Sequence, residues 1–278
     1  INGQIYHKNS TIMNTISPLA YVHPEAQIGE NVTVMAFAYI DRNTVIGDGC
    51  VVRPHVSILD GARIGRNCHF YEGCIIAATP QDFRWKGDPS GVVIGDNNTI
   101  REHVIINRSI YKDRATIIGN DSFIMAQTHI GHDSQIGNHV VLGNSVKIAG
   151  EVKINDFCIL SSSALVHEGC EIGQWVLIKG GCRVNSNVPP YAIMAHNPIV
   201  YYGVNAFILR KGKFPEETID NIAKCFRHIY QSNTSTFNAL RRIEADVDQG
   251  PERDAIVNFV RNHKYKIAAI RLDDRDMM

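Results

Sequence analysis

The chain has 278 residues, of which 44% are hydrophobic and 20% are charged, so it is long enough to bury a large core. Its 28 basic and 28 acidic side chains give a formal net charge of zero, which argues against a general nucleic-acid-binding protein. No apolar run reaches the roughly eighteen residues of a membrane-spanning helix, so we expect no membrane insertion.

Residues 1–13 differ from the rest of the chain. They lack the pattern of a signal peptide and fit the periodicity of the later sequence poorly. We therefore treat residues 1–13 as an N-terminal extension that lies outside the first predicted domain.

Residues 14–190 follow a six-residue repeat. An aliphatic or aromatic residue recurs at every sixth position from Ile16 to Ile76, again at Ile94, Ile100 and Ile106, and from Ile118 to Val184. A period of six is typical of a parallel β-helix, in which each repeat forms one short strand and one corner, and three repeats close a triangular coil of eighteen residues. The period fits neither an ordinary helix bundle nor a β-meander, and it does not fix the hand of the coil.

The cysteines follow the same period. Six of the seven lie four positions after a residue of the six-residue series, where Ser, Ala, Thr or Val stands in other repeats. We interpret them as small interior side chains, because a free cysteine behaves as a small hydrophobic residue and no CxxC pair suggests zinc. This use of cysteine fits a reducing, cytoplasmic location. The six are Cys50, Cys68, Cys74, Cys158, Cys170 and Cys182.

Two segments interrupt the period without changing its phase. They span residues 77–91 and 107–116, and the aliphatic series resumes after each. Long excursions from a regular scaffold are often functional, so we expect them to contribute to a site, the alternative being decorative surface loops.

The repeat is predicted to end at Val188-Pro189-Pro190, because consecutive prolines cannot continue a ladder of hydrogen bonds. Residues 191–278 are predicted to form a connector, 191–205, and a C-terminal helical domain. A first helix begins near Pro215, and two shorter ones are indicated by apolar residues at helical spacing. These helices would cap the open end of the solenoid.

Stacking predicts a polar cluster. Residues eighteen apart lie above one another in adjacent coils, so one edge should gather His129, His132, Asp133, Glu151, His167 and Glu168. His132 could accept a proton from a hydroxyl, Asp133 could fix its tautomer, and the amide of Gly150, one coil along, could meet an oxyanion. Such a set is suited to acyl transfer to an alcohol without a covalent enzyme intermediate.

Several motifs then occur in a characteristic order, and through them the chain resembles the UDP-N-acetylglucosamine O-acyltransferases of lipid A synthesis. The resemblance covers the chain from about Ile16 to its end. Its specific parts are Pro80-Gln81-Asp82, His129-Ile130-Gly131-His132-Asp133 and the helical tail together, and Ala149-Gly150, Gly180-Gly181-Cys182 and Gly203-Val204-Asn205 occur in the same order.

The resemblance implies a left-handed β-helix in a cytoplasmic homotrimer, with sites between neighbouring subunits. It implies transfer of a 3-hydroxyacyl group from acyl carrier protein, whose phosphopantetheine arm carries it, to the sugar 3-hydroxyl, without a metal or another cofactor. His132 matches the general base, Asp133 its partner and Gly150 the oxyanion donor. Sugar-contacting positions match Asp82, His129 and His167, nucleotide-contacting positions match Asn205 and Lys211, and Gly180 matches the floor of the acyl groove.

Two substrate-binding positions depart from the family pattern. Glu151 stands where many members have His, and Glu168 stands where Gln is usual. The tail also departs, and its basic residues Arg210, Lys211 and Lys213 could meet a diphosphate or the acidic carrier protein, or could simply be solvated.

Three alternatives stay open. The chain could be another hexapeptide-repeat acyltransferase that forms an ester or an amide on a related UDP-amino sugar. It could be a zinc enzyme that uses His129, His132 and His167 as ligands, although a spacing of 35 between the last two is not a whole number of coils. It could also be a solenoid that only binds partners.

Overall fold

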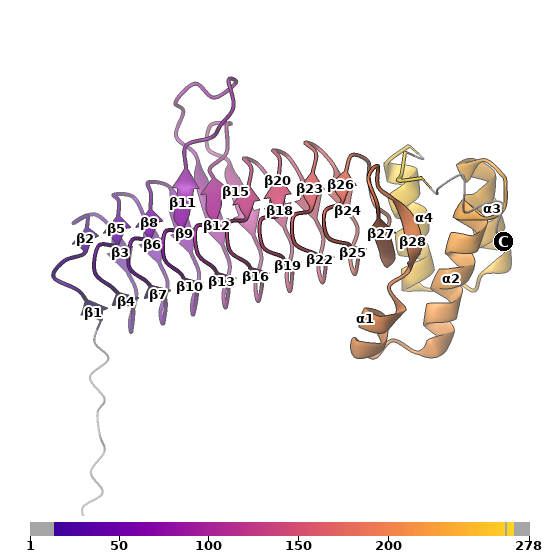
Figure 1. Ribbon diagram of the computed structural model, residues 1–278, viewed down its shortest axis with the longest axis horizontal. Helices are drawn as coiled ribbons and strands as arrows, with labels where there is room; N and C mark the ends of the chain where they lie inside the picture. The colour runs from indigo at the N-terminus through magenta and orange to yellow at the C-terminus, as the bar shows by residue number, and fades with distance from the viewer. Residues whose placement is uncertain (1–13, 265, 270–278) are drawn as a thin grey trace, which may run out of the picture.

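The computed structural model describes residues 14–264 and 266–269, and in this range the chain is a left-handed parallel β-helix followed by a group of helices (Figure 1). The predicted N-terminal extension, 1–13, lies outside the described residues. The three faces of the prism are three parallel sheets, which we call A, B and C in the order in which the chain visits them.

In the described residues sheet A has eleven strands, sheet B nine and sheet C eight. Sheet A comprises β1 (Thr15–Ile16), β4 (Thr33–Val34), β7 (Val51–Val52), β10 (His69–Phe70), β13 (Thr99–Ile100), β16 (Phe123–Ile124), β19 (Val141–Leu142), β22 (Ile159–Leu160), β25 (Leu177–Ile178), β27 (Ala192–Ala195) and β28 (Val200–Val204). Sheet B comprises β2 (Tyr21–Val22), β5 (Tyr39–Ile40), β8 (Ser57–Ile58), β11 (Ile75–Ala78), β14 (Ile105–Asn107), β17 (His129–Ile130), β20 (Lys147–Ile148), β23 (Leu165–Val166) and β26 (Arg183–Val184). Sheet C comprises β3 (Gln27–Ile28), β6 (Val45–Ile46), β9 (Ala62–Ile64), β12 (Gly91–Ile94), β15 (Ala115–Ile118), β18 (Gln135–Ile136), β21 (Lys153–Ile154) and β24 (Glu171–Ile172).

The six-residue series forms the core, as predicted. Its members are the inward-facing residues of the short strands, and Ile40, Ile106 and Val184 are among those with no exposed surface. Burying one such side chain contributes roughly 1.5–3 kcal/mol. Because each coil repeats this burial, one continuous core runs along the prism and into the helices.

The cysteines are interior residues. All seven are buried and free, including Cys225, which lies in the helical region rather than in the repeat. Burial raises the pKa of the Cys74 and Cys158 thiols to about 12, so these groups are un-ionised at neutral pH.

Two loops interrupt the stacking, and both leave the prism at the edge between sheets B and C. Strand partners lie eighteen residues apart in most coils, but thirty apart across residues 79–90 and twenty-four apart across residues 108–114. Ile76 therefore pairs with Ile106, and Ile106 with Ile130, and the register shifts only after Ile76, where the first loop begins. The excursions predicted from the period are thus two loops on one edge, and Figure 1 shows them projecting from the same side of the prism.

The β-sheet continues past the predicted end of the repeat. After Pro189 and Pro190, β27 pairs in parallel with β25 and then forms an antiparallel hairpin with β28. The expectation that the two prolines end the ladder was wrong, because they occupy a corner beside Gly173 while Val188 still donates to and accepts from the preceding coil. The predicted connector, 191–205, is therefore mostly sheet.

Four helices follow in the described residues: α1 (Ala206–Lys211), α2 (Glu216–Tyr230), α3 (Thr236–Asp246) and α4 (Pro251–Asn262). The last three are at the predicted positions, and α1 was not predicted. Tyr201 of β28 stacks on Phe226 and Tyr230 of α2, which fixes the helices against the end of the sheet (Figure 1). None of the described helices is long and apolar enough to cross a membrane.

Candidate active site

The polar cluster lies along the edge between sheets B and C, which we call the B–C edge. The two loops, 79–90 and 108–114, and the corners that follow β17, β20 and β23 stack along it in chain order. The second residue after each inward aliphatic is His132, Gly150 and Glu168 in these three corners, so the eighteen-residue spacing aligns them as predicted.

His132 and Asp133 form a buried pair at this edge. His132 is 6% exposed, and its Nδ1 lies 3.0 Å from Asp133 Oδ2. Asp133 is itself held by the second loop, because Ser109 Oγ donates to its Oδ1 and the Ile110 amide donates to Oδ2 at 3.0 Å. A carboxylate with three fixed neighbours can orient an imidazole and stabilise its protonated form. Sequence reasoning missed Ser109, whose position in an irregular loop the period does not determine.

Gly150 lies directly against the imidazole. A Cβ atom built on Gly150 would be 2.3 Å from His132 Cε1 and Nε2, so only glycine fits here. Its N–H has no acceptor among the described residues. At the edge between sheets C and A, by contrast, equivalent amides donate to an Asx side chain one coil along, as Asn120 does to Asn138 and Asn138 does to Asp156. The Gly150 amide is therefore left available beside the His132 ring.

Asp82 approaches the opposite side of the ring from the first loop. Its Oδ2 lies 3.3 Å from His132 Nε2, so two carboxylates flank the imidazole. Arg84 binds both oxygens of Asp82, and these hydrogen bonds hold the pKa of the Asp82 carboxyl well below its usual range. Asp82 therefore stays ionised in the folded protein.

Glu151 and Glu168 lie in successive corners and both contact Arg84. The Arg84 guanidinium is 2.6 Å from Glu168 Oε1 and 3.4 Å from Glu151 Oε1. Tyr111 of the second loop donates to Glu151 at 2.9 Å, and this bond raises the pKa of the tyrosine. Glu151 and Glu168 are thus tied to loop residues that sequence reasoning did not single out.

The remaining histidines of the predicted cluster are at the same edge but are not bonded to His132. His129 lies in β17 with its ring half-buried, and burial lowers its pKa, so it is neutral at neutral pH. His167 follows β23 and accepts a hydrogen bond from Arg183 Nε at 2.6 Å. Both rings are placed beside the cluster rather than within it.

Three predicted site residues lie elsewhere in the chain, away from the B–C edge. Gly180 follows β25 at the edge between sheets A and B and is exposed. Asn205 is buried beneath α1, where its Nδ2 donates to the Trp175 carbonyl and its Oδ1 has no partner. Lys211 lies in the last turn of α1 with its Nζ 4.6 Å from the Phe207 ring.

The basic tail contains one paired residue. Arg210 forms two hydrogen bonds with Glu216, at 2.7 and 2.9 Å, so its charge is already neutralised. Lys211 and Lys213 form no ion pair with a described residue. An anion at this surface would therefore meet the two lysines rather than the full cluster.

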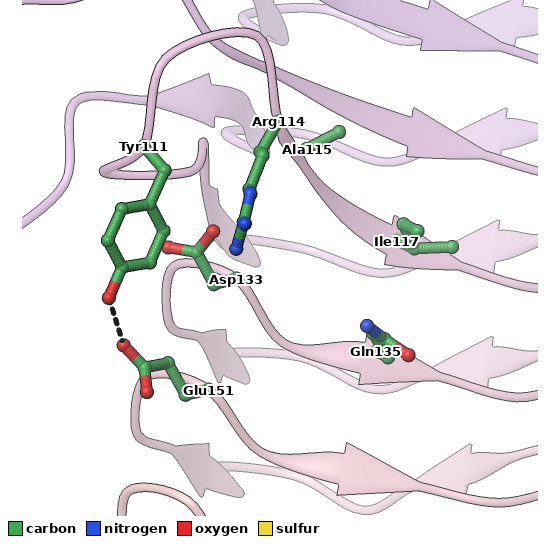
Figure 2. A pocket seen from close by; sticks show the side chains of 7 residues that line it. All are labelled: Tyr111, Arg114, Ala115, Ile117, Asp133, Gln135 and Glu151. Carbon is green, nitrogen blue, oxygen red and sulfur yellow. Dashed lines mark hydrogen bonds between the residues drawn. The ribbon is translucent and has the colours of Figure 1, made fainter.

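A cavity of about 530 Å³ lies beside the pair of His132 and Asp133, over the outer face of sheet C. Figure 2 shows Tyr111 and Arg114 from the second loop on one side, Asp133 and Glu151 on the edge, and Ile117 and Gln135 on the strands. The wall mixes an aromatic ring, a guanidinium and two carboxylates, so a polar ligand could lie alongside Asp133.

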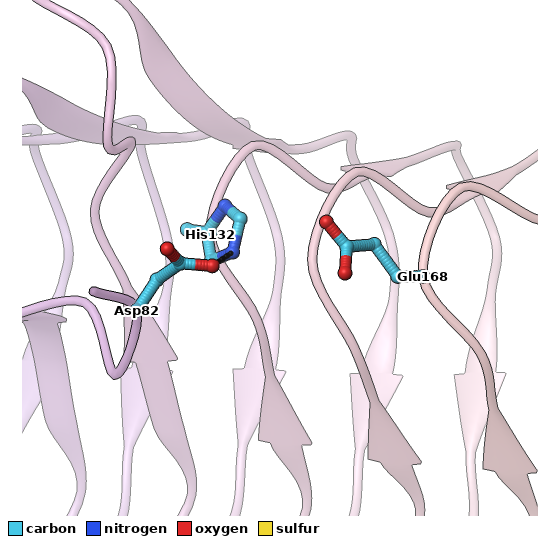
Figure 3. Close-up of side chains that lie close together, drawn as sticks. All are labelled: Asp82, His132 and Glu168. Atoms are coloured by element: carbon cyan, nitrogen blue, oxygen red, sulfur yellow. Dashed lines mark ion pairs between the residues drawn. The ribbon is translucent and has the colours of Figure 1, made fainter. Parts of the chain in front are cut away.

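The zinc alternative has no geometric support in the part of the chain that the structure describes. The group there that could hold a metal ion is Asp82, His132 and Glu168, drawn in Figure 3, and it contains neither His129 nor His167. Arg84 already places its cationic side chain between the two carboxylates of that group, at 2.9 and 2.6 Å.

Comparison with known proteins identifies the family to which the chain belongs. Residues 187–268 match the model of the second domain of UDP-N-acetylglucosamine O-acyltransferase, and residues 115–150 match the hexapeptide repeats of bacterial transferases. The chain is 36% identical to acyl-[acyl-carrier-protein]–UDP-N-acetylglucosamine O-acyltransferase of Thermodesulfovibrio yellowstonii, covering 91% of this chain and 98% of that one. It is 43% identical to the enzyme of the same name from Chlorobaculum parvum, covering 89% and 94%.

Solved structures agree. The UDP-N-acetylglucosamine acyltransferase of Bacteroides fragilis superposes with a TM-score of 0.89 at 46% identity, covering 92% of this chain and 100% of that one. The enzyme of Francisella novicida gives 0.87 at 31% identity, covering 94% and 96%. The motif order, the prism with its helical cap and these relatives together show that the chain is an acyltransferase and belongs to the UDP-N-acetylglucosamine O-acyltransferase family.

Proposed function

We propose that the protein transfers a 3-hydroxyacyl group from acyl carrier protein to the 3-hydroxyl of UDP-N-acetylglucosamine, the first step of lipid A synthesis. The names of its relatives support the two substrates. The observation that carries the proposal is the contact between His132 and Gly150, which puts a base and an unpaired amide N–H in adjacent coils.

His132 is the general base. Its Nε2 removes the proton from the sugar hydroxyl while that oxygen attacks the thioester carbonyl carbon. The carbonyl oxygen becomes an oxyanion, which the Gly150 N–H stabilises. When the tetrahedral intermediate collapses, the carbon–sulfur bond breaks and the thiolate of the carrier's prosthetic arm takes the proton back from the imidazolium. No covalent acyl-enzyme forms in this sequence.

Asp133 supports the base. With Nδ1–H donating to Asp133, the lone pair of Nε2 is directed away from Asp133 and lies beside Asp82 Oδ2 and Gly150. Ser109 and the Ile110 amide prevent Asp133 from turning away, so the tautomer is fixed before substrate arrives. The protein itself supplies every group in this scheme, and the acyl group arrives on its carrier.

The active enzyme is a homotrimer in this proposal. Gly180 lies at the edge between sheets A and B, Asn205 directly precedes α1 and Lys211 lies in α1, so one subunit does not gather all the predicted substrate-binding residues beside His132. A second copy whose neighbouring edge faces the B–C edge would bring Lys211 and the Gly180 floor to the site. The nucleotide and the acyl chain would then bind between subunits, and Asn205 would act by holding α1 in place.

A turnover panel tests the function. Acyl carrier proteins loaded with chains of different length are assayed against UDP-N-acetylglucosamine and against its 3-amino analogue, which separates ester formation from amide formation on a related UDP-amino sugar. His132→Ala should lower kcat/KM by roughly 10²–10⁴ while the trimer persists. His69→Ala, on an exposed histidine of β10, is the matched control. Wild-type turnover that survives in His132→Ala would remove His132 from the role of base.

A further inference from the structure

Arg84 links the first loop to two coils of the prism. Its side chain reaches Glu168, 84 residues away, at 2.6 Å and Glu151, 67 residues away, at 3.4 Å, while it also binds Asp82. The two glutamates come from successive coils, and both carboxylates meet the same guanidinium.

The loop has few other polar attachments near its tip, where the Trp85 side chain is half-buried and its Nε1 has no hydrogen-bond partner among the described residues. Its ends are fixed, because Asn107 donates to the Thr79 carbonyl at 2.8 Å and the Asp113 amide donates to the Pro89 carbonyl at 2.9 Å. Between residues 81 and 88, the polar contacts with the prism that the described residues make are those of Asp82 and Arg84. Phe83 beside them is fully exposed, so it provides no anchor.

We propose that Arg84 is a positioning residue for the acyl transfer, and that Glu151 and Glu168 act through it as anchors rather than as direct substrate ligands. This inference rests on the proposed function. Arg84 fixes the loop over the B–C edge and holds Asp82 at the correct distance from His132. We call Arg84, Glu151 and Glu168 the loop clamp.

Charge balance explains why a cation is needed there. Asp82 and Asp133 flank the imidazole, and Glu151 and Glu168 follow in the next two coils. Carboxylates gathered this closely repel one another. Arg84 offsets part of this negative charge and holds Asp82 through both of its oxygens. The clamp can still open for substrate, since Arg84 and Glu168 are about half exposed and each such ion pair contributes little.

A double-mutant cycle tests the anchoring role. Arg84→Gln should lower kcat/KM about tenfold, the size expected for losing a hydrogen-bonded charge. Glu168→Ala should lower it less, and the double variant should match Arg84→Gln alone, because the glutamate has nothing left to anchor. Arg84→Lys should recover part of the loss. Multiplicative effects of the two substitutions would mean that Glu168 acts on substrate directly, which would overturn the proposal.

The pH profile separates positioning from a general loss of structure. Arg84→Gln should move the acid limb of kcat/KM to higher pH, because the remaining carboxylates then favour the imidazolium. Glu168→Ala should move it to lower pH. An acid limb that is unchanged in both variants would contradict the charge role. The ionisable groups facing this region from the surrounding elements are Asp82, Tyr111, Arg114, His129, Asp133, Glu151, His167 and Glu168.

A third measurement does not need turnover. Trp85 lies next to Arg84 in the loop, and the only other tryptophan, Trp175, can be replaced by Phe. In that background, Arg84→Gln should make Trp85 more accessible to acrylamide quenching, whereas Arg66→Gln, which breaks an exposed pair with Asp96, should not. If the wild type shows no turnover with these substrates, the proposed function fails while this test of the clamp stands. Unchanged Trp85 quenching in Arg84→Gln would overturn the clamp.

Discussion

At the scale of single residues, the site depends on the close contact between His132 and Gly150, which leaves no room for a side chain at Gly150. The ring of His132 lies where a side chain on the next coil would be, and Gly150 is the residue that permits it. Because strands in adjacent coils are held at a fixed separation of about 4.8 Å, the backbone cannot retreat to make room. The proposed role of His132 as a base is therefore linked to the absence of one Cβ atom at Gly150.

Gly150→Ala tests this link. The methyl group would overlap the imidazole at 2.3 Å and displace it from Asp133, so we expect kcat/KM to fall at least a hundredfold, comparable to losing general base catalysis. The thermal midpoint should change little if the ring moves instead of the backbone. Gly203→Ala is the control, since a Cβ atom there would meet nothing within 4 Å. Activity close to wild type in Gly150→Ala would contradict the assigned geometry.

The period predicts site residues in the repeat but not those in the loops, of which only Asp82 was predicted, through the resemblance to the family. His132, Gly150 and Glu168 align because eighteen residues make one coil, so counting places them on one edge. Ser109, Tyr111 and Arg84 reach the same edge from loops whose paths no period determines. The acidic departures at Glu151 and Glu168 were the available signal, since two added carboxylates near a base call for a nearby cation.

At the scale of elements, the junction between the prism and the helices is partly electrostatic. Glu171 of β24 lies 3.2 Å from His263 at the end of α4 and 3.1 Å from Lys153 of β21. Burial would raise the pKa of Glu171, but hydrogen bonds from Asn155 and Lys153 outweigh it, so the net shift is downwards. A lowered pKa means that the carboxylate stabilises the fold while it is ionised.

This junction predicts a pH-dependent stability. The contribution of Glu171 should be complete above its unfolded-state pKa of about 4.3 and should be lost as the pH falls through the lower folded-state value. Wild type should therefore melt at a higher temperature than Glu171→Gln at pH 7, and this difference should shrink as the pH falls below about 4.3. Thermal melts across this range provide the measurement. Glu25→Gln, on an exposed side chain, should follow wild type throughout, and a gap that stays constant as the pH falls would rule out the ionised carboxylate as the cause.

Strands and helices could be predicted where a single sequence periodicity determines them. The six-residue period predicts strands in every coil, and helical spacing predicts α2, α3 and α4. The hairpin of β27 and β28 was missed because Pro189 and Pro190 suggest a stop, whereas the structure places them in a corner where no ladder N–H is required. Helix α1 was missed because six residues are too few for a clear apolar period.

At the scale of the whole molecule, the proposed sharing of the site between subunits predicts that two weakly active variants can complement each other. His132→Ala and Lys211→Glu should each be weakly active alone, but mixed trimers should regain activity, because some interfaces pair an intact His132 with an intact Lys211 from the neighbour. Random mixing in equal amounts restores about a quarter of the sites of a cyclic trimer. Affinity capture through a tag on one variant confirms that mixing occurred. Captured mixed trimers without regained activity would place both residues in a site within one subunit.

The edge between sheets C and A carries a column of Asp and Asn side chains that bind the amides of neighbouring coils, whereas the B–C edge leaves the Gly150 amide unbound and carries both loops. The C–A edge thus holds neighbouring coils together, whereas the B–C edge carries the proposed active site. Corner residues of the B–C edge could therefore be exchanged between homologues without altering the Asp and Asn side chains of the C–A edge. Such chimaeras should keep their register, since the side chains that bind the amides of neighbouring coils would remain in place.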